Sequence, residues 1–370
     1  MPAKSPRIRY AVVGLGYIAQ IAVLPAFAHA KNAELAALVS GDPRKLKRLG
    51  RKYSVDLLYS YDDYDRCIES GSIDAVYIAL PNHMHREYTV RAAEAGIHVL
   101  CEKPMALDEE ECRDMIRAAR TNRIRLMIAY RLHFEKANLA AVELARGDRI
   151  GEARVFDSVF TMQVRDRDNI RLKKAAGGGP LYDIGIYCIN AARYLFRDEP
   201  EEVVAFAARG ADGRFAEVDE AVSAVLRFPG ARLASFSCSF GASDAGAYDL
   251  VGTKGSLRLD PAYEYAGALT LTTKIGGRAT RRRFARGDQF APEIVYFSDC
   301  VREGREPEPG GREGIADVRI IRALAESART GVPVRLPPFE KDERPREVQR
   351  IVRPAVREPD LVHARSPEGD

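Results

Sequence analysis

A carboxylate and a phenol that could transfer a proton, Asp183 and Tyr187, lie four residues apart in the stretch 177–196. Three glycines and Pro180 open this stretch, and proline is well placed in the first turn of a helix. Residues four apart on a helix share a face, so the two groups can reach one substrate together. Apolar residues recur at helical spacing and form a separate stripe: Leu181, Ile184, Cys188, Ala192 and Leu195.

The same two residues also fit a purely structural role. An aspartate in the first turn of a helix interacts favourably with the helix dipole. A tyrosine one turn later can pack half-buried while its hydroxyl stays near the surface. The residue pattern alone leaves both interpretations of Asp183 and Tyr187 open.

A strand, a tight turn and a helix are predicted at residues 8–27, which read IRYAVVGLGYIAQIAVLPAF. The turn contains the pattern G-x-G-x-x-A, with Gly14, Gly16 and Ala19 at the fixed positions. Gly14 would permit the sharp turn, Gly16 would let a pyrophosphate approach the backbone, and Ala19 would allow close helix–strand packing. Because the motif follows a strand and opens a helix, it indicates a dinucleotide-binding fold.

The second predicted strand, AELAALVS, ends where such folds select between NAD and NADP. NAD enzymes usually carry a carboxylate at this point, which accepts a hydrogen bond from the ribose 2′-hydroxyl. This chain has Ser40 there, with Arg44 and Lys45 nearby. A small hydroxyl and two cations suit a 2′-phosphate, so the sequence favours NADP over NAD. Asp42 also lies here and could cap the next helix, which is compatible with this interpretation.

Polar clusters follow the next two predicted strands, IDAVYIAL and IHVLCE. Asn82, His83 and His85 come after the first strand, and Glu102 and Lys103 come at the end of the second. Ligands of open α/β sheets bind at the carboxyl ends of strands, so both clusters are expected near the cofactor. The two histidines lack arranged cysteine or carboxylate partners, so no metal site is expected.

Length and composition favour a two-domain cytoplasmic enzyme. The chain has 370 residues, 46% of them hydrophobic and 30% charged, as in soluble globular proteins. Its net charge of +4 and the short RRRF run at 281–284, interpreted as a solvated strand face, argue against a nucleic-acid partner. No run approaches the ~18 apolar residues of a membrane span, and no export signal is apparent. The six cysteines form no C-x-x-C pair, which indicates reduced thiols in packing positions.

Five motifs follow one another along the chain: GLGYIA, LPNHMH, CEKPM, AYRLHF and GGGPLYDIGIYCIN. With these motifs the sequence, from about residue 7 to residue 336, resembles the Gfo/Idh/MocA oxidoreductase family, and within it the glucose–fructose oxidoreductase branch. The resemblance implies an α/β protein with an NADP-binding Rossmann domain, built on a doubly wound parallel sheet, at residues 1–130. It further implies a substrate and oligomerisation domain at residues 131–338. That α/β domain would contain a large open, mostly antiparallel sheet, whose exposed face would support a homodimer or homotetramer.

The resemblance also implies roles for individual residues. In the family, the lysine of the EKP motif lies by the nicotinamide and the substrate, and here it is Lys103. The family pair Asp-x-x-x-His or Asp-x-x-x-Tyr corresponds to Asp183 and Tyr187, and tyrosine is the form found in the glucose–fructose branch. Cofactor contacts are expected from Gly14, Gly16, Tyr17, Ile18, Ser40, Arg44, Lys45, Leu80, Pro81, Asn82, His85, Glu102, Lys103, Arg131 and Arg171.

These roles predict an NADP-dependent enzyme that transfers hydride between nicotinamide and a sugar, either an aldose or a related polyol or ketose. Tyr187 would be the acid/base, Lys103 would stabilise its phenolate, and Asp183 would bind a sugar hydroxyl or orient Lys103. Two alternatives remain: an NAD(P)-assisted glycosidase, and a nucleotide-sensing protein without catalysis. The presence of all three residues argues against the second.

Three features depart from the family. Relatives often carry a tryptophan near residues 169–174, whereas this chain has no tryptophan and reads NIRLKK there. Some exported relatives have an N-terminal arm over the cofactor, and this chain is expected to lack one, so its NADP should exchange more freely. Residues 339–370 match nothing in the family, and their charge and proline content predict a loosely ordered tail.

Overall fold

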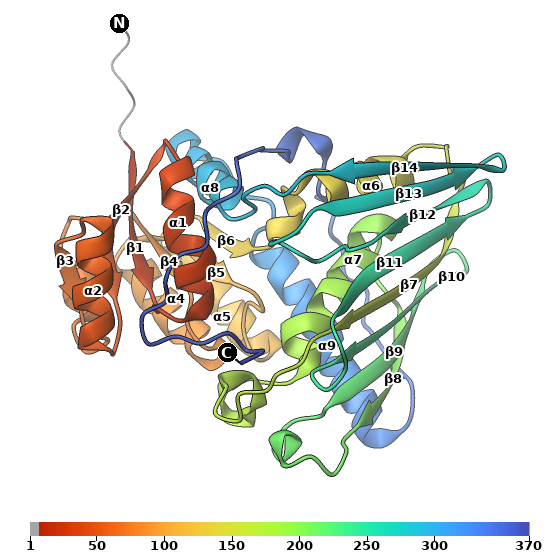
Figure 1. Ribbon diagram of the computed structural model, residues 1–370, viewed down its shortest axis with the longest axis horizontal. Helices are drawn as coiled ribbons and strands as arrows, with labels where there is room; N and C mark the ends of the chain where they lie inside the picture. The colour runs from red at the N-terminus through yellow and green to blue at the C-terminus, as the bar shows by residue number, and fades with distance from the viewer. Residues whose placement is uncertain (1–6, 370) are drawn as a thin grey trace, which may run out of the picture. The chain divides into compact units, whose positions relative to one another are not determined.

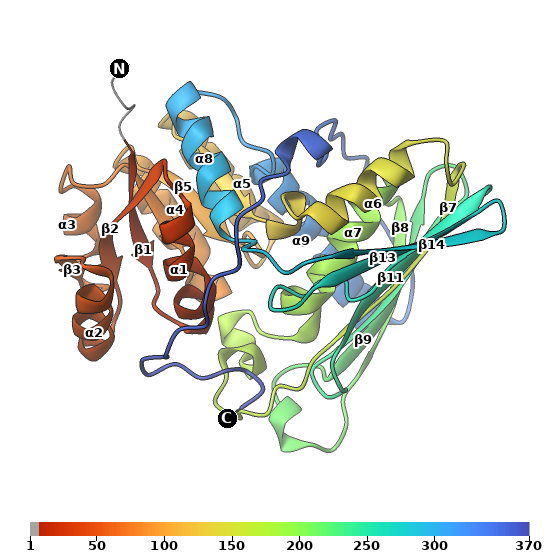
Figure 2. The same ribbon diagram turned by 45° about the horizontal axis from the view of Figure 1, so that its top comes forward.

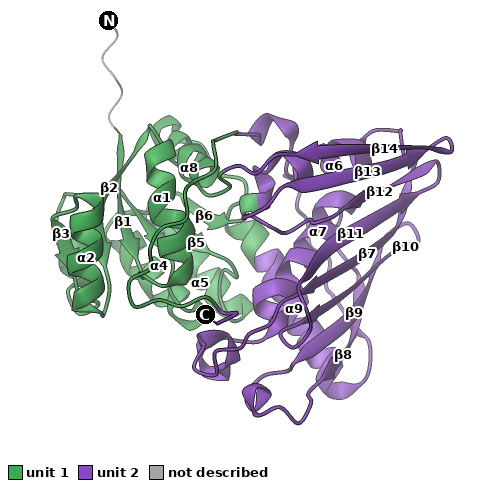
Figure 3. Ribbon diagram, in the orientation of Figure 1, with its two compact units in different colours: residues 1–131, 288–314, 352–366 green, residues 132–287, 315–351, 367–370 purple. Residues whose placement is uncertain are grey.

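The computed structural model describes residues 7–369 and divides the chain into two compact units (Figure 3). Unit 1 comprises residues 1–131, 288–314 and 352–366, and unit 2 comprises residues 132–287, 315–351 and 367–370. Residues 1–6 and Asp370, which the sequence assigned to the first domain and to the tail, lie outside the described residues. The chain therefore contributes three separate segments to unit 1, where the sequence suggested one continuous N-terminal domain.

Unit 1 contains a six-stranded sheet in which neighbouring strands are parallel (Figure 1). The order across the sheet is β3-β2-β1-β4-β5-β6, which confirms the predicted doubly wound parallel sheet. Ligands of such sheets bind at the carboxyl ends of the strands, where the order changes direction between β1 and β4. The strands are β1 Ile8–Val13, β2 Ala33–Val39, β3 Leu57–Tyr59, β4 Ala75–Ile78, β5 His98–Glu102 and β6 Leu126–Ala129.

Helices connect the strands of unit 1, and local sequence explains where they begin. Asp42 caps α2, because its side chain accepts hydrogen bonds from the backbone N–H groups of Arg44 and Lys45. The helical segment after the glycine-rich loop begins with a π-helical turn and ends with a 3₁₀ turn. The helical elements within unit 1 are the π-helical turn Ala19–Val23, α1 Leu24–Ala26, the 3₁₀ turn Phe27–His29, α2 Pro43–Tyr53, α3 Tyr64–Ile68, the 3₁₀ turn Asn82–Met84, α4 His85–Glu94, α5 Glu109–Thr121 and α8 Ala291–Glu303.

Unit 2 is built on a nine-stranded sheet with the order β14-β13-β12-β11-β7-β10-β9-β8-β15. Strands β7 and β10 are parallel, and the other neighbouring pairs of the described sheet are antiparallel, so the predicted open, mostly antiparallel sheet is confirmed. Buried and exposed residues alternate along β9, as expected when one face is packed and the other is not. The strands are β7 Ala153–Thr161, β8 Glu202–Ala208, β9 Ala221–Phe228, β10 Arg232–Ser239, β11 Ala245–Gly252, β12 Gly255–Leu259, β13 Leu269–Ile275, β14 Arg278–Phe284 and β15 Val334–Arg335.

Helices α6 and α7 pack on one face of this sheet, which Figure 2 shows nearly edge-on. A π-helical turn, Leu181–Gly185, leads directly into α7, so the predicted helix is continuous through both candidate residues, Asp183 and Tyr187. All five residues of the predicted apolar stripe are buried. The α-helices are α6 Lys136–Arg146, α7 Ile186–Phe196 and α9 Gly311–Thr330, of which α9 begins in unit 1 and continues in unit 2.

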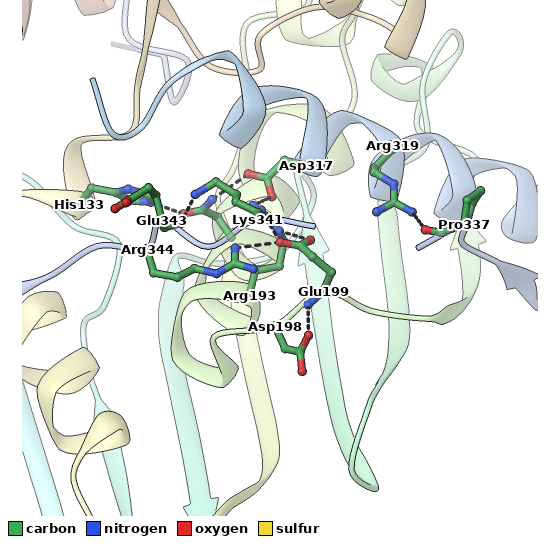
Figure 4. Close-up of polar contacts among 11 residues, drawn as sticks. His133, Arg193, Asp198, Glu199, Asp317, Arg319, Pro337, Lys341, Glu343 and Arg344 are labelled. Carbon is green, nitrogen blue, oxygen red and sulfur yellow. Dashed lines mark hydrogen bonds and ion pairs between the residues drawn. The ribbon is translucent and has the colours of Figure 1, made fainter. Parts of the chain in front are cut away.

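The C-terminal residues contribute buried side chains to both units. Arg344 is 3% exposed and forms an ion pair with Glu199 of unit 2 at 2.8 Å (Figure 4). Val362 is 4% exposed and belongs to unit 1. The charged composition predicted disorder because charged residues rarely form a core, but a buried partner of opposite charge compensates Arg344. The prediction of a loosely ordered tail therefore does not hold at these positions.

Two further sequence expectations bear on the cellular setting. All six cysteines are buried and free, as predicted for thiols in packing positions. Among the described residues, 7–369, the helices are too short or too polar to cross a lipid bilayer.

Candidate active site

The glycine-rich loop after β1 has the geometry that a dinucleotide requires. Gly14 has a φ of +94°, and a Cβ at this position would lie 2.5 Å from the carbonyl oxygen of Ala79. Glycine is therefore needed where the loop passes the end of β4. At Gly16 a Cβ would meet no described atom within 4 Å, so the backbone is open to a ligand. Ala19 is fully buried, as the predicted helix–strand contact requires.

The end of β2 carries the residues expected at the adenosine ribose. Ser40 is buried, and its Oγ accepts a hydrogen bond from the backbone N–H of Asp42 at 3.2 Å. Arg44 is exposed and Lys45 is half-buried on the first turn of α2. Burial lowers the pKa of Lys45, and the Asp42 carboxylate opposes this shift. The predicted hydroxyl and cations thus lie together in the structure, and Asp42 is the predicted helix cap.

His85, which the sequence predicted to contact the cofactor, lies between two backbone carbonyl groups. The side chain is fully buried, with Nδ1 2.8 Å from the carbonyl oxygen of Pro104 and Nε2 2.9 Å from that of Leu80. Burial lowers the pKa of His85, and the two carbonyl groups oppose the shift. Both ring nitrogens thus face the backbone. The imidazole therefore links the loop after β4 to the loop that follows Lys103.

Glu102 and Lys103 lie at the end of β5, in a half-buried setting. The hydroxyl of Tyr77 donates a hydrogen bond to Oε1 of Glu102 at 2.8 Å. Burial raises the pKa of Glu102, and the charge of Lys103 opposes the increase. Arg131, also expected near the cofactor, is 5% exposed and donates to the side chain of Gln289. Buried polar side chains of unit 1, Tyr77, Arg131 and Gln289, thus surround the EKP motif, and we call them the buried polar layer.

Glu293 is a member of this layer that the sequence did not indicate. It lies in the first turn of α8, is fully buried, and neither carboxylate oxygen has a hydrogen-bond partner among the described residues. Burial raises its pKa well above the ordinary value, and the nearby charge of Glu102 raises it further. Burial therefore favours the neutral, protonated form of this carboxyl group. No local signal could have found it, because its helix reads as an ordinary apolar pattern far along the chain from Glu102.

In unit 2, Arg171 and Asp183 form an ion pair, with 2.6 Å between Nε and Oδ2. Their side chains are 26% and 19% exposed, so both are within reach of solvent. Burial lowers the pKa of Arg171, but the Asp183 carboxylate raises it more, so the pKa lies above its ordinary value. Tyr187 also raises the pKa of Arg171. The half-buried ring of Tyr187 packs against Phe160 and Tyr263, with centroid distances of 5.4 and 5.8 Å. The acid and the phenol therefore lie one helical turn apart, and the cation reaches the acid from the 3₁₀ turn Ile170–Leu172.

The other end of α7 is fixed by buried charges, shown in Figure 4. Arg193 is fully buried and donates hydrogen bonds to Glu199 at 2.8 Å and to Asp317 at 2.6 Å. Asn190 donates to Asp317 at 2.9 Å, and its Oδ1 lies 2.9 Å from Nε2 of His133. We call Arg193, Glu199, Asp317 and Arg344 the buried ion cluster. The cluster holds the helix whose first turns present the candidate catalytic pair.

The structure distributes the predicted site residues over the two units. Arg171, Asp183 and Tyr187 lie together in unit 2, so Arg171 accompanies the predicted catalytic pair. Among residues 7–369, no group of three or more histidine, cysteine, aspartate or glutamate side chains is arranged to hold a metal ion. The predicted residues found in unit 1 are Gly14, Gly16, Tyr17, Ile18, Ser40, Arg44, Lys45, Leu80, Pro81, Asn82, His85, Glu102, Lys103 and Arg131.

Family models match most of the chain. An oxidoreductase-family model with an NAD-binding Rossmann fold matches residues 8–130, and a GFO/IDH/MocA C-terminal domain model matches residues 138–258. The chain belongs to the Gfo/Idh/MocA oxidoreductase family. The resemblance drawn from the five motifs is thereby confirmed.

Several Gfo/Idh/MocA relatives align with nearly the whole chain. D-xylose 1-dehydrogenase [NADP(+)] from Haloarcula marismortui is 32% identical over 336 residues, which cover 89% of this chain and 93% of that enzyme. The crystal structure of aldose–aldose oxidoreductase from Caulobacter crescentus with glycerol matches with 39% identity and a TM-score of 0.86, over 89% of this chain and 100% of that one. A 3-ketoreductase from Actinomadura kijaniata, solved with NADP and TDP-benzene, matches with 26% identity and a TM-score of 0.80, over 87% and 98%.

Proposed function

We propose that this protein is an NADP-dependent oxidoreductase that transfers hydride between the nicotinamide and a sugar. The observation that carries the proposal is the 2.6 Å ion pair between Arg171 and Asp183, because Asp183 lies one helical turn before Tyr187. A phenol beside a fixed cation can take up and release the proton of a hydroxyl group. Similarity to aldose–aldose oxidoreductase and D-xylose 1-dehydrogenase supports a sugar as the substrate that bears this hydroxyl.

The residues at the carboxyl end of the unit 1 sheet fit NADP. The open backbone at Gly16, at the start of a helix, suits a pyrophosphate. Ser40, Arg44 and Lys45 offer a hydroxyl and two cations to a 2′-phosphate. When bound, the nicotinamide accepts or supplies the hydride. Relatives named for NADP(+) or solved with NADP support this choice, and NAD is the less favoured alternative.

Tyr187 would take the hydroxyl proton when the sugar is oxidised and return it when the sugar is reduced. An ordinary phenol, with a pKa of ~10, is a weak base at neutral pH, so a cation must stabilise the phenolate. We give this task to Lys103, the family's EKP lysine, with Arg171 contributing from within unit 2. Asp183 would bind a second sugar hydroxyl and hold Arg171 in place.

The test is absorbance at 340 nm over a panel of aldoses, with NADP and NAD offered separately. Reduction of NADP by one sugar, followed by reoxidation with another, supports the proposal. Hydrolysis of a glycoside without net change in absorbance would favour the NAD(P)-assisted glycosidase. Dinucleotide binding without either reaction would leave the nucleotide-sensing protein as the better description.

The outward face of the unit 2 sheet supports a homo-oligomer, with a homodimer as the simplest form. Val251, Val155 and Leu233 are neighbours in register across β11, β7 and β10, and they are 45%, 47% and 47% exposed. Phe206 on β8 is 73% exposed. A row of exposed apolar side chains this wide is typical of an interface. Light scattering should show a dimer or tetramer that Leu233→Lys converts to monomer, and a monomeric wild type would contradict the proposal.

The free, buried cysteines support a cytoplasmic location, which we include in the proposal. A reducing compartment keeps such thiols unpaired. Fractionation of cells of the source organism, followed by detection of the protein, would test it.

A further inference from the structure

Residues 352–366 return the chain to unit 1 and lie beside α1 in both views of the molecule (Figures 1 and 2). The segment is anchored near its start at Arg353. The Nε of Arg353 donates to the carbonyl oxygen of His29 at 3.1 Å, and its carbonyl oxygen accepts from the N–H of Asp288 at 3.1 Å. His29 closes the helical segment that begins at the glycine-rich loop, so the anchor lies at the far end of that segment.

The second anchor lies at the glycine-rich loop itself. The side chain of Gln20 is 1% exposed, and its amide makes a two-way contact with the backbone of Val362. Oε1 accepts from the Val362 N–H at 2.7 Å, and Nε2 donates to the Val362 carbonyl oxygen at 2.9 Å. Nε2 also donates to the carbonyl oxygen of Leu15 at 2.9 Å, and the Gln20 N–H donates to the carbonyl of Gly16. One buried amide thus joins the C-terminal segment to the loop expected to bind pyrophosphate.

A third group of contacts lies at the end of β2. Nδ1 of His363 is 3.0 Å from Oδ2 of Asp42, and Lys52 of α2 donates to the carbonyl oxygen of Asp360 at 3.3 Å. The hydrogen bond with His363 is the main cause of a lowered pKa of Asp42. Because β1 and β2 are adjacent and parallel, the loops that follow them meet at one edge of the sheet. The segment therefore passes from the loop after β1 to the loop after β2.

We propose that residues 352–366 form a strap that completes the dinucleotide site and slows release of the bound cofactor. The inference depends on the proposed function, because it takes NADP as the ligand. The pyrophosphate is expected at Gly16, and Gln20, which binds the strap, is hydrogen-bonded to Gly16. The ribose is expected at Ser40, and Asp42, which also contacts the strap, is hydrogen-bonded to Ser40. A dinucleotide that lies between these loops would have to displace or pass the strap when it leaves. The sequence analysis expected NADP to exchange freely, whereas the C-terminal strap argues for slow exchange.

His363 also explains how a carboxylate can lie beside a 2′-phosphate. Oδ1 of Asp42 accepts from the N–H groups of Arg44 and Lys45, and Oδ2 faces His363. Both oxygens are engaged, so the negative charge of Asp42 is compensated where the phosphate would bind. The strap thus contributes a polar group to the part of the site that distinguishes NADP from NAD.

The test measures NADPH dissociation, with no substrate and no turnover. Protein loaded with NADPH is mixed with excess NADP, and the loss of bound NADPH fluorescence gives the rate constant. His363→Ala removes the contact with Asp42, and Val362→Pro removes the N–H that donates to Gln20. Each should raise the rate constant about fivefold, the effect of one net hydrogen bond. Arg365→Ala, an exposed position in the same segment, is the matched control and should leave the rate unchanged.

Truncation after residue 351 should raise the rate constant further than either substitution. Trypsin cleavage after Arg357, an exposed site in the strap, should be slower when NADP is bound. If the truncated chain fails to fold, as judged by circular dichroism, the two point variants decide. Equal dissociation rates in the wild type and both variants would overturn the strap while leaving the proposed function intact. A wild type that binds no dinucleotide would overturn both.

Discussion

The two ends of the helix 181–196 use the same residue types for different purposes. Its first turns carry Asp183 and Tyr187, with Arg171 paired to the aspartate, and these side chains are partly exposed. Its last turns carry Arg193 and Tyr194, which are both buried. Arg193 donates hydrogen bonds to Asp317 and Glu199, and Tyr194 donates to Asn138 at 3.1 Å. An acid, a cation and a phenol therefore occur at both ends.

Exposure separates the two roles. A charge that is buried and fully paired cannot change its protonation or its partner without a large cost, so it contributes to structure. A charge pair that reaches solvent can rearrange around a substrate at little cost. The first turns are therefore the end of the helix suited to chemistry, and the last turns are the end that fixes its position. Four substitutions test this contrast.

Tyr187→Phe should have the largest effect on activity. It removes the proposed acid/base, so kcat should fall by ~10²–10⁴ while NADP binding and stability stay near the wild type. The matched control is Tyr194→Phe at the buried end. That variant should keep its kcat and lose about 1 kcal/mol of unfolding free energy, because its hydrogen bond to Asn138 is lost. Steady-state kinetics and urea unfolding measure both, and equal kcat values in the two variants would contradict the contrast.

Arg193→Leu should have the largest effect on stability. It leaves the carboxylates of Asp317 and Glu199 buried without their main cation, and breaking a buried pair costs about 3–5 kcal/mol. Arg146→Ala is the control, because the Arg146–Glu143 pair is 39% and 37% exposed and should contribute less than about 1 kcal/mol. Urea unfolding gives both values. Similar losses of unfolding free energy in the two variants would show that burial does not determine how much an ion pair contributes to stability.

Arg171→Leu should reduce activity more than stability. The ion pair with Asp183 is partly exposed, so its loss should change the unfolding free energy by less than about 1 kcal/mol. Loss of the cation and misplacement of Asp183 should lower kcat by roughly 10². Kinetics and unfolding of the same preparation provide the comparison. A variant that is destabilised as strongly as Arg193→Leu would place Arg171 with the structural charges.

Glu293→Gln extends the contrast to unit 1, where a buried acid lacks a hydrogen-bond partner among the described residues. Unfolded glutamate ionises near pH 4.3, whereas the raised pKa keeps folded Glu293 protonated to a much higher pH. Between these two pKa values the folded state binds one more proton than the unfolded state, so this group lowers the unfolding free energy by about 1.4 kcal/mol per pH unit as the pH rises. In urea unfolding from pH 5 to 8, the unfolding free energy of Glu293→Gln should increase relative to that of the wild type as the pH rises. Parallel stability curves would show that Glu293 is ionised in the folded protein.

Elements set by local pattern could be predicted from the sequence. The apolar and turn pattern placed a strand, a tight turn and a helix within residues 8–27, and the structure has β1 at Ile8–Val13 and a helical segment that begins at Ala19. Gly14 and Asp42 were also predicted correctly, because a tight turn and a helix cap depend on neighbouring residues. The family motifs then indicated the type of both sheets, doubly wound parallel in one domain and mostly antiparallel in the other.

Contacts between distant residues could not be predicted in the same way. The pairing of Arg344 with Glu199, and of Val362 with Gln20, joins residues that no spacing rule connects. His85 shows a second limit: its position after a strand was predicted correctly, but the rule for strand ends does not say whether a side chain points toward a ligand or into the core. The catalytic roles of Lys103, Asp183 and Tyr187 stay predictions until the variants are measured.

The interleaved arrangement of the two units also constrains how the protein is made. Translation yields the six Rossmann strands early, but α8 emerges only after the second sheet has been synthesised, and the strap emerges after that. A nascent chain on the ribosome therefore exposes the surface that α8 will cover. Glu199 is likewise synthesised well before Arg344, its partner in a buried ion pair. Premature termination within the last thirty residues would release a polypeptide with both sheets present and the cofactor-binding unit unfinished.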